Sequence, residues 1–206
     1  MGDAKGVAHL RKADPVMRKL IDEHGKPRPA RRTGRDDHYG ALVRSIVGQQ
    51  LSTKAARSIY GRLTDRFGGR PPTPEEVLAD DPEALRAAAG LSHAKVKYLR
   101  SLAEHVEKGE VELDRLDALS DEDVVAALIA VKGLGQWSAD MFLMFHLERP
   151  DVLAVGDLGI RRAVQEAYGL EEPPGPTELE RIGVPWRPYR TLACRYLWAS
   201  LDNEPV

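Results

Sequence analysis

The sequence predicts an all-α protein. Apolar residues recur at intervals of three and four in nearly every segment of the 206 residues, as they do on one face of a helix. Capping residues and glycine or proline stops separate these segments at short distances. No alternating apolar and polar run of useful length indicates a strand.

The predicted helices begin and end at recognisable signals. Asp14 caps the first helix, whose next residue is a proline, and Gly25 ends it; Ser52 caps another. Segments 26–35 and 171–187 are rich in Pro, Gly and charge, and we interpret them as loops or linkers. In chain order, the predicted helices cover residues 15–24, 39–48, 53–67, a segment opened by the capping box at 73–76, 93–108, 121–130, 136–147, 158–168 and 188–201.

The length suits one domain or two small lobes with a real hydrophobic core. We expect a central helical lobe formed by residues 36–130. The second helical lobe would combine residues 1–35 with residues 131–206.

Composition excludes several classes of protein. Hydrophobic residues make up 42% and charged residues 30%, which is typical of a soluble chain. No apolar run approaches the roughly 20 residues that span a bilayer, and the N-terminus has no signal-like apolar core. We therefore expect a cytoplasmic protein. The lone Cys194 excludes an intramolecular disulfide and a cysteine-ligated iron–sulfur cluster.

The net charge of −2 hides an uneven distribution, because acidic residues gather in other segments than basic ones. Two basic groups could form a face that binds nucleic acid, or they could be solvated helix surfaces without a partner. These groups are Arg28, Arg31, Arg32 and Arg35, and then Lys54, Arg57, Arg62 and Arg66.

Two glycines lie between the predicted helices 121–130 and 136–147. The turn Gly133-Leu134-Gly135 is short enough that the helices must meet at an angle. Glycines allow positive φ and leave backbone N–H groups uncovered at a helix N-terminus, where the dipole favours an anion such as a phosphate. The plain alternative is a glycine C-cap in a tight helical turn.

The wider context of this turn resembles the helix-hairpin-helix DNA glycosylase superfamily. Four blocks match in order between about residues 36 and 200, and together they are similar to the bacterial 3-methyladenine DNA glycosylase II branch. The blocks are Ile46–Ser52 with Ala55 and Ala56, Leu128–Ala139, Asp151–Ala163, and Trp186–Arg190 with Tyr196–Trp198. The resemblance implies two helical lobes with an active-site cleft between them, and the family's N-terminal β-rich lobe is expected to be absent.

The resemblance implies that Asp157 is the catalytic aspartate. Asp157 is also a good N-cap for the helix that follows, and the two roles are compatible because the helix dipole stabilises an anion there. Breaking an N-glycosidic bond builds positive charge on the sugar. A fixed carboxylate stabilises that charge or deprotonates an attacking water.

Further site residues follow from the resemblance. Trp137, Trp198, Met141 and Leu158 align with the base pocket, although core burial is an equal alternative for the two tryptophans. Gln50 is the expected wedge that fills the gap left by a flipped base, with Leu51 second. Both could instead be ordinary helix-end and core residues. Contacts to the DNA backbone are expected at Gly133, Gly135, Gln136 and Ser138.

Backbone carbonyls of the hairpin, at Ile129, Val131 and Leu134, hold a monovalent cation in some relatives, so Na⁺ or K⁺ is a candidate here. We expect no metal bound by side chains and no other cofactor. Bifunctional members carry a lysine nucleophile where this chain has Trp137, so no Schiff base is expected and the backbone should stay intact.

The sequence therefore predicts a monomeric, monofunctional glycosylase that excises alkylated purines from damaged double-stranded DNA, without a membrane partner. Two alternatives stay open. One is a non-catalytic helix-hairpin-helix module that only binds DNA. The other is a glycosylase of the same fold that acts on oxidised or deaminated bases.

Overall fold

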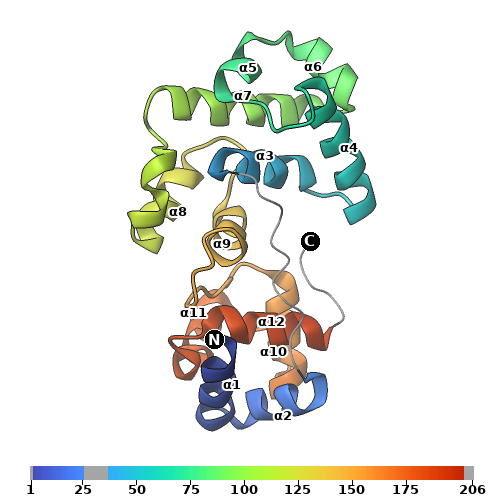
Figure 1. The fold of residues 1–206 in the computed structure, drawn as a ribbon. Helices are drawn as coiled ribbons and strands as arrows, with labels where there is room; N and C mark the ends of the chain where they lie inside the picture. Colours follow the sequence, from blue (N-terminus) through green and yellow to red (C-terminus); the bar gives the residue numbers. More distant parts are fainter. Residues whose placement is uncertain (1, 26–36, 202–206) are drawn as a thin grey trace. The chain divides into compact units, whose positions relative to one another are not determined.

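The computed structural model describes residues 2–25 and 37–201. Within these ranges the chain forms twelve α-helices and two 3-10 helices, with no strand (Figure 1). The prediction of an all-α fold is confirmed. No helix in this described part combines the length and apolarity needed to cross a bilayer. The basic run at Arg28, Arg31, Arg32 and Arg35 falls outside the described residues.

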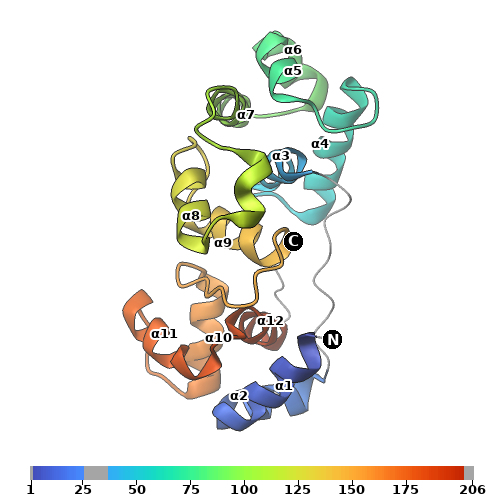
Figure 2. The same ribbon diagram turned by 60° about the vertical axis from the view of Figure 1, so that its left-hand side comes forward.

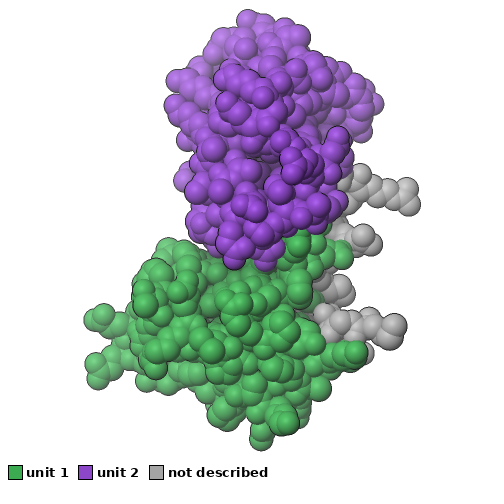
Figure 3. All heavy atoms as spheres, turned by 90° about the vertical axis from the view of Figure 1, so that its left-hand side faces the viewer, with its two compact units in different colours: residues 1–31, 143–206 green, residues 32–142 purple. Residues whose placement is uncertain are grey.

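The chain divides into two compact units (Figure 3). The first combines residues 1–31 with 143–206, and the second is residues 32–142. The sequence placed the second boundary at 130, whereas residues 131–142 group with the central unit. The physical reason is that the hairpin turn is bonded to that unit: the side chain of Gln49 donates to Gly133 O at 2.7 Å, and Lys132 N donates to Ser101 Oγ at 3.1 Å.

The helices of the second unit pack around an aliphatic core. Helix α5 packs on α7 and α4 on α6, while α3 lies against both α4 and α7 (Figure 2). Leu42, Leu63, Leu85, Leu99 and Leu102 are at most 1% exposed in this core. Its elements are α3 (His38–Gly48), α4 (Thr53–Arg66), α5 (Pro74–Ala79), α6 (Pro82–Ala89), α7 (His93–Glu107), η1 (Leu113–Ala118), α8 (Asp121–Ile129) and the start of α9 (Gln136–Phe145).

The first unit is built around the C-terminal helix α12, which packs against α1, α2 and α10. Eight consecutive residues of α12, from Thr191 to Trp198, are buried. Trp186 and Met17 complete this core with no exposed surface. The elements are α1 (Gly2–Ala13), α2 (Pro15–His24), α10 (Leu158–Tyr168), α11 (Pro176–Ile182), η2 (Val184–Trp186) and α12 (Arg190–Ser200).

The interpretation of residues 171–187 as a loop or linker is wrong. Gly175 and Pro176 are the N-cap and first residue of α11, so the glycine and proline begin a helix here. Leu179 and Trp186 are fully buried, and tertiary packing thus stabilises a segment whose composition favours a loop.

Candidate functional site

Asp157 is the N-cap of α10 in the first unit. Its Oδ1 accepts the N–H of Ile160 at 2.8 Å and the indole N–H of Trp198 at 3.0 Å. Two donors and the positive end of the helix dipole therefore hold the carboxylate in one orientation. The structure brings together two predicted site residues that lie 41 positions apart.

Trp198 contributes a polar edge to this arrangement. The side chain is 1% exposed, and its ring centroid lies 5.9 Å from that of Phe145. The ring of Trp198 is therefore buried, as the core alternative expects, and its N–H bonds the predicted catalytic carboxylate. A contact between Trp198 and a flipped base stays a prediction. Leu158, which follows Asp157, is 75% exposed.

The hairpin turn between α8 and α9 requires its first glycine. Gly133 has a φ of +95°, and a Cβ there would lie 2.2 Å from Cγ of Tyr98. As described above, the carbonyl of Gly133 accepts from Gln49 and the N–H of Lys132 donates to Ser101. These two bonds hold the turn in place.

The second glycine has a different role. The carbonyl of Gly135 accepts the N–H of Ala139 at 3.1 Å, so Gly135 is the N-cap residue of α9. A glycine has no side chain to cap the first amides of the helix, and no atom lies within 4 Å of the position its Cβ would take. The geometry can therefore admit an anion close to the backbone at this helix start.

Helix α9 presents the other predicted site residues of the second unit. Trp137 is 40% exposed, and Met141, one turn later, is 9% exposed. The side chain of Gln136 donates to Asp140 Oδ1 at 2.8 Å. Ser138 is buried, and its contact with the DNA backbone stays a prediction.

The loop between α3 and α4 holds the predicted wedge. Gln50 is exposed and adopts a φ of +57°, a conformation that non-glycine residues rarely take. Leu51 is 36% exposed. Gln49, which the sequence placed in the wedge loop or at the helix end, ties this loop to the hairpin across 84 positions of the chain. A strained, exposed residue between two fixed elements is a typical feature of functional loops.

The basic residues of α4 fall into two groups. Arg66 forms a two-point ion pair with Asp80 at 2.6 Å, and Arg62 donates to Ala89 O and Ser58 Oγ. Their charges therefore serve the fold. Lys54 and Arg57 are exposed in the first turns of α4, directly after the wedge loop.

The candidate cation ligands are backbone oxygens. The carbonyl of Val131 accepts the N–H of Leu134 at 3.0 Å, which occupies one of its two lone pairs. Among the described residues no cluster of three His, Cys, Asp or Glu could hold a metal. A monovalent cation on Ile129, Val131 and Leu134 stays a prediction.

Comparison with known proteins identifies the family. Residues 43–188 match the family described as HhH-GPD superfamily base excision DNA repair protein. The chain belongs to the HhH-GPD superfamily. The match contains the wedge loop, the hairpin and Asp157, and it covers every predicted site residue except Trp198.

Individual members of the HhH-GPD superfamily resemble the chain over most of its length. DNA-3-methyladenine glycosylase 1 of Schizosaccharomyces pombe is 34% identical over 198 residues, which are 95% of this chain and 86% of that protein. The S. pombe 3-methyladenine DNA glycosylase solved in complex with abasic DNA has a TM-score of 0.84 at 33% identity, covering 96% of this chain and 97% of the other. The DNA-3-methyladenine glycosidase of Bacillus halodurans has a TM-score of 0.74 at 39% identity, with coverage of 91% and 89%.

Sequence reasoning missed how this HhH-GPD chain holds its site residues. The block from Trp186 to Arg190 was matched to the superfamily without a role, yet Arg190 bonds Asp151 at the start of the segment that carries Asp157. The pairing of an acidic and a basic residue in two matched blocks was a usable signal. The bond from Gln49 to the carbonyl of Gly133 left no such signal in the sequence, because every residue type has a backbone carbonyl.

Proposed function

We propose that this chain is a monofunctional DNA glycosylase that flips alkylated purines out of duplex DNA and removes them by hydrolysis in base excision repair. The observation that carries the proposal is the carboxylate of Asp157, oriented by Ile160 and Trp198 in a chain of the HhH-GPD superfamily. The alkylpurine class is supported by relatives that are named 3-methyladenine glycosylases.

The reaction breaks the bond between C1′ of the sugar and a base nitrogen, and the bonding electrons leave with the base. Positive charge then builds on the sugar, and water adds to C1′ with loss of a proton. Asp157 stabilises that charge or accepts that proton. The bonds from Ile160 and Trp198 to Oδ1 hold the carboxylate in place for either role.

A base that is already cationic suits this site best. Methylation at N3 of adenine or N7 of guanine weakens the glycosidic bond, so the leaving group needs no general acid. A cationic base also gains from contact with an aromatic face, by about 0.5–2 kcal/mol. Trp137, at 40% exposed, is the aromatic side chain of the predicted pocket with accessible surface, and Met141 lies one turn away on the same helix.

Engagement of the duplex is assigned to the second unit. The start of α9 at Gly135, where the N-cap residue has no side chain, is proposed to bind a phosphate through its backbone amides. Gln50 is proposed to fill the space of the flipped nucleotide, and Leu51 lies beside it. Lys54 and Arg57 would add phosphate contacts next to this wedge.

The absence of lyase activity is part of the proposal. Trp137 stands where bifunctional relatives carry a lysine, and Lys132 lies on the other side of the hairpin turn. Without an amine at that position no Schiff base forms with the sugar.

One experiment tests these statements together. Duplex oligonucleotides with single 3-methyladenine, 7-methylguanine, hypoxanthine or 8-oxoguanine lesions are incubated with excess protein, and abasic sites are scored with and without borohydride. We expect the two methylated bases to be excised fastest, with no trapped covalent complex. An oxidised base as the best substrate would replace the alkylpurine assignment, and duplex binding without excision would favour the non-catalytic module. A trapped adduct would overturn the monofunctional assignment.

A further inference from the structure

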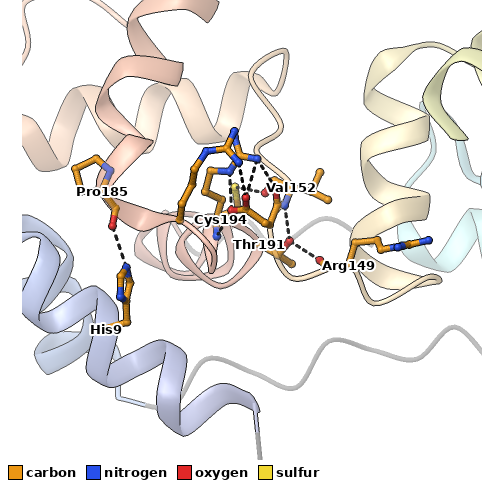
Figure 4. Close-up of polar contacts among 9 residues, drawn as sticks. His9, Arg149, Val152, Pro185, Thr191 and Cys194 are labelled. Carbon is orange, nitrogen blue, oxygen red and sulfur yellow. Dashed lines mark hydrogen bonds and ion pairs between the residues drawn. The ribbon is translucent and has the colours of Figure 1, made fainter. Parts of the chain in front are cut away.

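The segment that carries Asp157 is attached to α12 well before it reaches the carboxylate. The hydroxyl of Thr191 donates to Arg149 O at 2.7 Å and accepts the N–H of Val152 at 3.1 Å (Figure 4). The backbone N–H of Thr191 donates to Pro150 O at 3.1 Å. One residue in the first turn of α12 thus holds three backbone groups of residues 149–152.

Three residues near Thr191 in the sequence complete this attachment. Arg190 forms a two-point ion pair with Asp151, with Nε to Oδ1 at 2.7 Å and the second nitrogen to Oδ2 at 3.1 Å, and it also donates to Asp151 O. Arg187 adds a bond to Asp151 Oδ2 at 2.7 Å. One turn into α12, the Sγ of Cys194 lies 3.8 Å from Val152 O (Figure 4).

The other end of the segment is attached to the same face of the same helix. Thr191, Cys194 and Trp198 have the spacing of residues that share one helical stripe, and two turns of about 5.4 Å separate the first from the last. Trp198 bonds Asp157, as described above.

Between these attachments the segment has little freedom. Residues 152–154 are buried, and the segment folds on itself through Val155 N to Leu153 O and Asp157 N to Ala154 O. A shift at residues 149–152 is therefore transmitted to Asp157.

We propose that Asp151, Arg190 and Thr191 form a positioning junction, a set of contacts that fixes the position of Asp157 along the axis of α12. With the junction intact, the N–H of Ile160 and that of Trp198 meet the same oxygen, Oδ1. Without it, the segment moves along α12 and the carboxylate loses its fixed orientation. These residues act through Asp157 and do not touch the substrate. The activity readout of this inference rests on the proposed function.

Thr191→Val tests the junction with little change in side-chain volume, and Thr191→Ser is its matched control because it keeps the hydroxyl. Tyr196→Phe is the stability control, since it removes a hydrogen bond from the same helix to Gly25 O, at 3.1 Å, away from the Asp157 segment. The measurements are the single-turnover excision rate, the Kd for abasic duplex and the unfolding temperature.

We expect Thr191→Val to lower the excision rate about 10- to 100-fold, because a displacement of about 1 Å can cost 100-fold. Its Kd should stay within about threefold of the wild type, as should the excision rate of Thr191→Ser. Tyr196→Phe should lower the unfolding temperature and leave the rate unchanged. A wild-type rate in Thr191→Val would overturn the inference, as would rate losses in Thr191→Val and Tyr196→Phe that follow stability alone.

A second measurement does not need activity. The indole N–H resonance of Trp198, assigned with a Trp198→Phe variant, reports its hydrogen bond to Asp157. We expect it to shift and to exchange faster with water in Thr191→Val, and to stay unchanged in Tyr196→Phe. An unchanged Trp198 resonance in Thr191→Val would reject the junction even if the wild type excised no base, whereas a shifted one would uphold it in that case.

Discussion

Replacing Asp157 with asparagine or alanine separates its two roles, as helix cap and as catalytic anion. Asparagine keeps an oxygen that can accept from Ile160 and Trp198, and asparagine caps helices as well as aspartate does. Only the charge is lost, with a cost in stability of about 1–2 kcal/mol from the helix dipole and the weaker hydrogen bonds. For a chain of this size that corresponds to a fall in Tm of roughly 2–8 °C.

Alanine removes the acceptor as well. The lost cap costs about 1 kcal/mol, and the buried N–H of Trp198 left without a partner costs about 1–3 kcal/mol. The expected loss in Tm for Asp157→Ala is therefore about twice that for Asp157→Asn.

Excision should respond differently from stability. Both variants lack the anion, so both should lose about 100- to 1,000-fold or more in the single-turnover excision of 7-methylguanine, corrected for loss without enzyme. Binding to abasic duplex should remain. An Asp157→Asn enzyme within about threefold of the wild-type rate would refute the catalytic assignment. Equal unfolding temperatures for the two variants would refute the energetic role of the Trp198 bond.

Three further perturbations test single features of the second unit. Gln50→Ala and Gln50→Gly should weaken binding to abasic duplex equally, because both remove the side-chain amide. Gln50→Gly should be more stable than Gln50→Ala by about 1 kcal/mol, because glycine adopts the positive φ of this position without strain. Unequal losses in binding would show that the backbone conformation, and not the amide, determines the affinity. Tyr39→Phe should leave the free energy of unfolding in denaturant unchanged or raise it by up to about 1 kcal/mol, because the buried hydroxyl has no hydrogen-bond partner among the described residues. A clear loss of stability would show that the hydroxyl does have a partner. Hydrogen bonds from Arg70, and then from the Thr73 backbone, lower the pKa of Glu76 to about 2, so stability from this group is present above its ordinary pKa and is lost as pH falls towards 2. The stability gap between wild type and Glu76→Gln should narrow over that range, and a constant gap would contradict the ion pair.

The sequence predicted those helices whose start signals are local. Ser52, Ser92 and Ser120 each cap a helix in the structure, and Thr73 forms the expected capping box with Glu76. In each case the donor lies within three residues of the acceptor, so the pattern is visible in a short window.

Helix α1 shows why other elements were missed. Gly6 lies inside it, where helix propensity opposes a glycine. A Cβ at that position would lie 2.7 Å from Leu192 Cδ2 and 3.0 Å from Tyr189 Cδ1, so the glycine allows close packing on the C-terminal helix. The reason for the residue lies more than 180 positions away, and a single sequence does not reveal it.

In the candidate site, too, local sequence signals could be recognised and long-range contacts could not. Asp157 and the hairpin glycines could be found because they lie in motifs. The bonds that orient them, from Trp198 and Gln49, join positions 41 and 84 residues apart. Those bonds depend on tertiary packing, which motif spacing does not report.

Asp14 shows that the arrangement around Asp157 is not by itself a sign of catalysis. Asp14 is also a helix N-cap that accepts a tryptophan N–H, yet it is only 6% exposed, whereas Asp157 is half-buried. Oδ1 accepts from Val16 and Met17, and Oδ2 accepts from Trp186 at 2.9 Å and from the hydroxyl of Tyr168. Burial and the bond to Asp14 raise the pKa of the Tyr168 phenol, so it stays a donor.

The same substitution at the two aspartates should therefore have opposite consequences. In Asp14→Asn the new amide must face one pair of donors. The hydroxyl of Tyr168 can rotate to accept from the new amide. The indole N–H of Trp186 is only a donor and has no exposed surface, so it would lose its acceptor, which lowers stability by about 1–3 kcal/mol. The loss of charge adds to this, so Asp14→Asn should unfold at a lower temperature than Asp157→Asn. Its excision rate, measured well below that temperature, should match the wild type, because no oxygen of Asp14 is available to a sugar. A fully folded Asp14→Asn protein that has lost excision would contradict this reasoning, since it would mean that burial does not distinguish a structural carboxylate from a catalytic one.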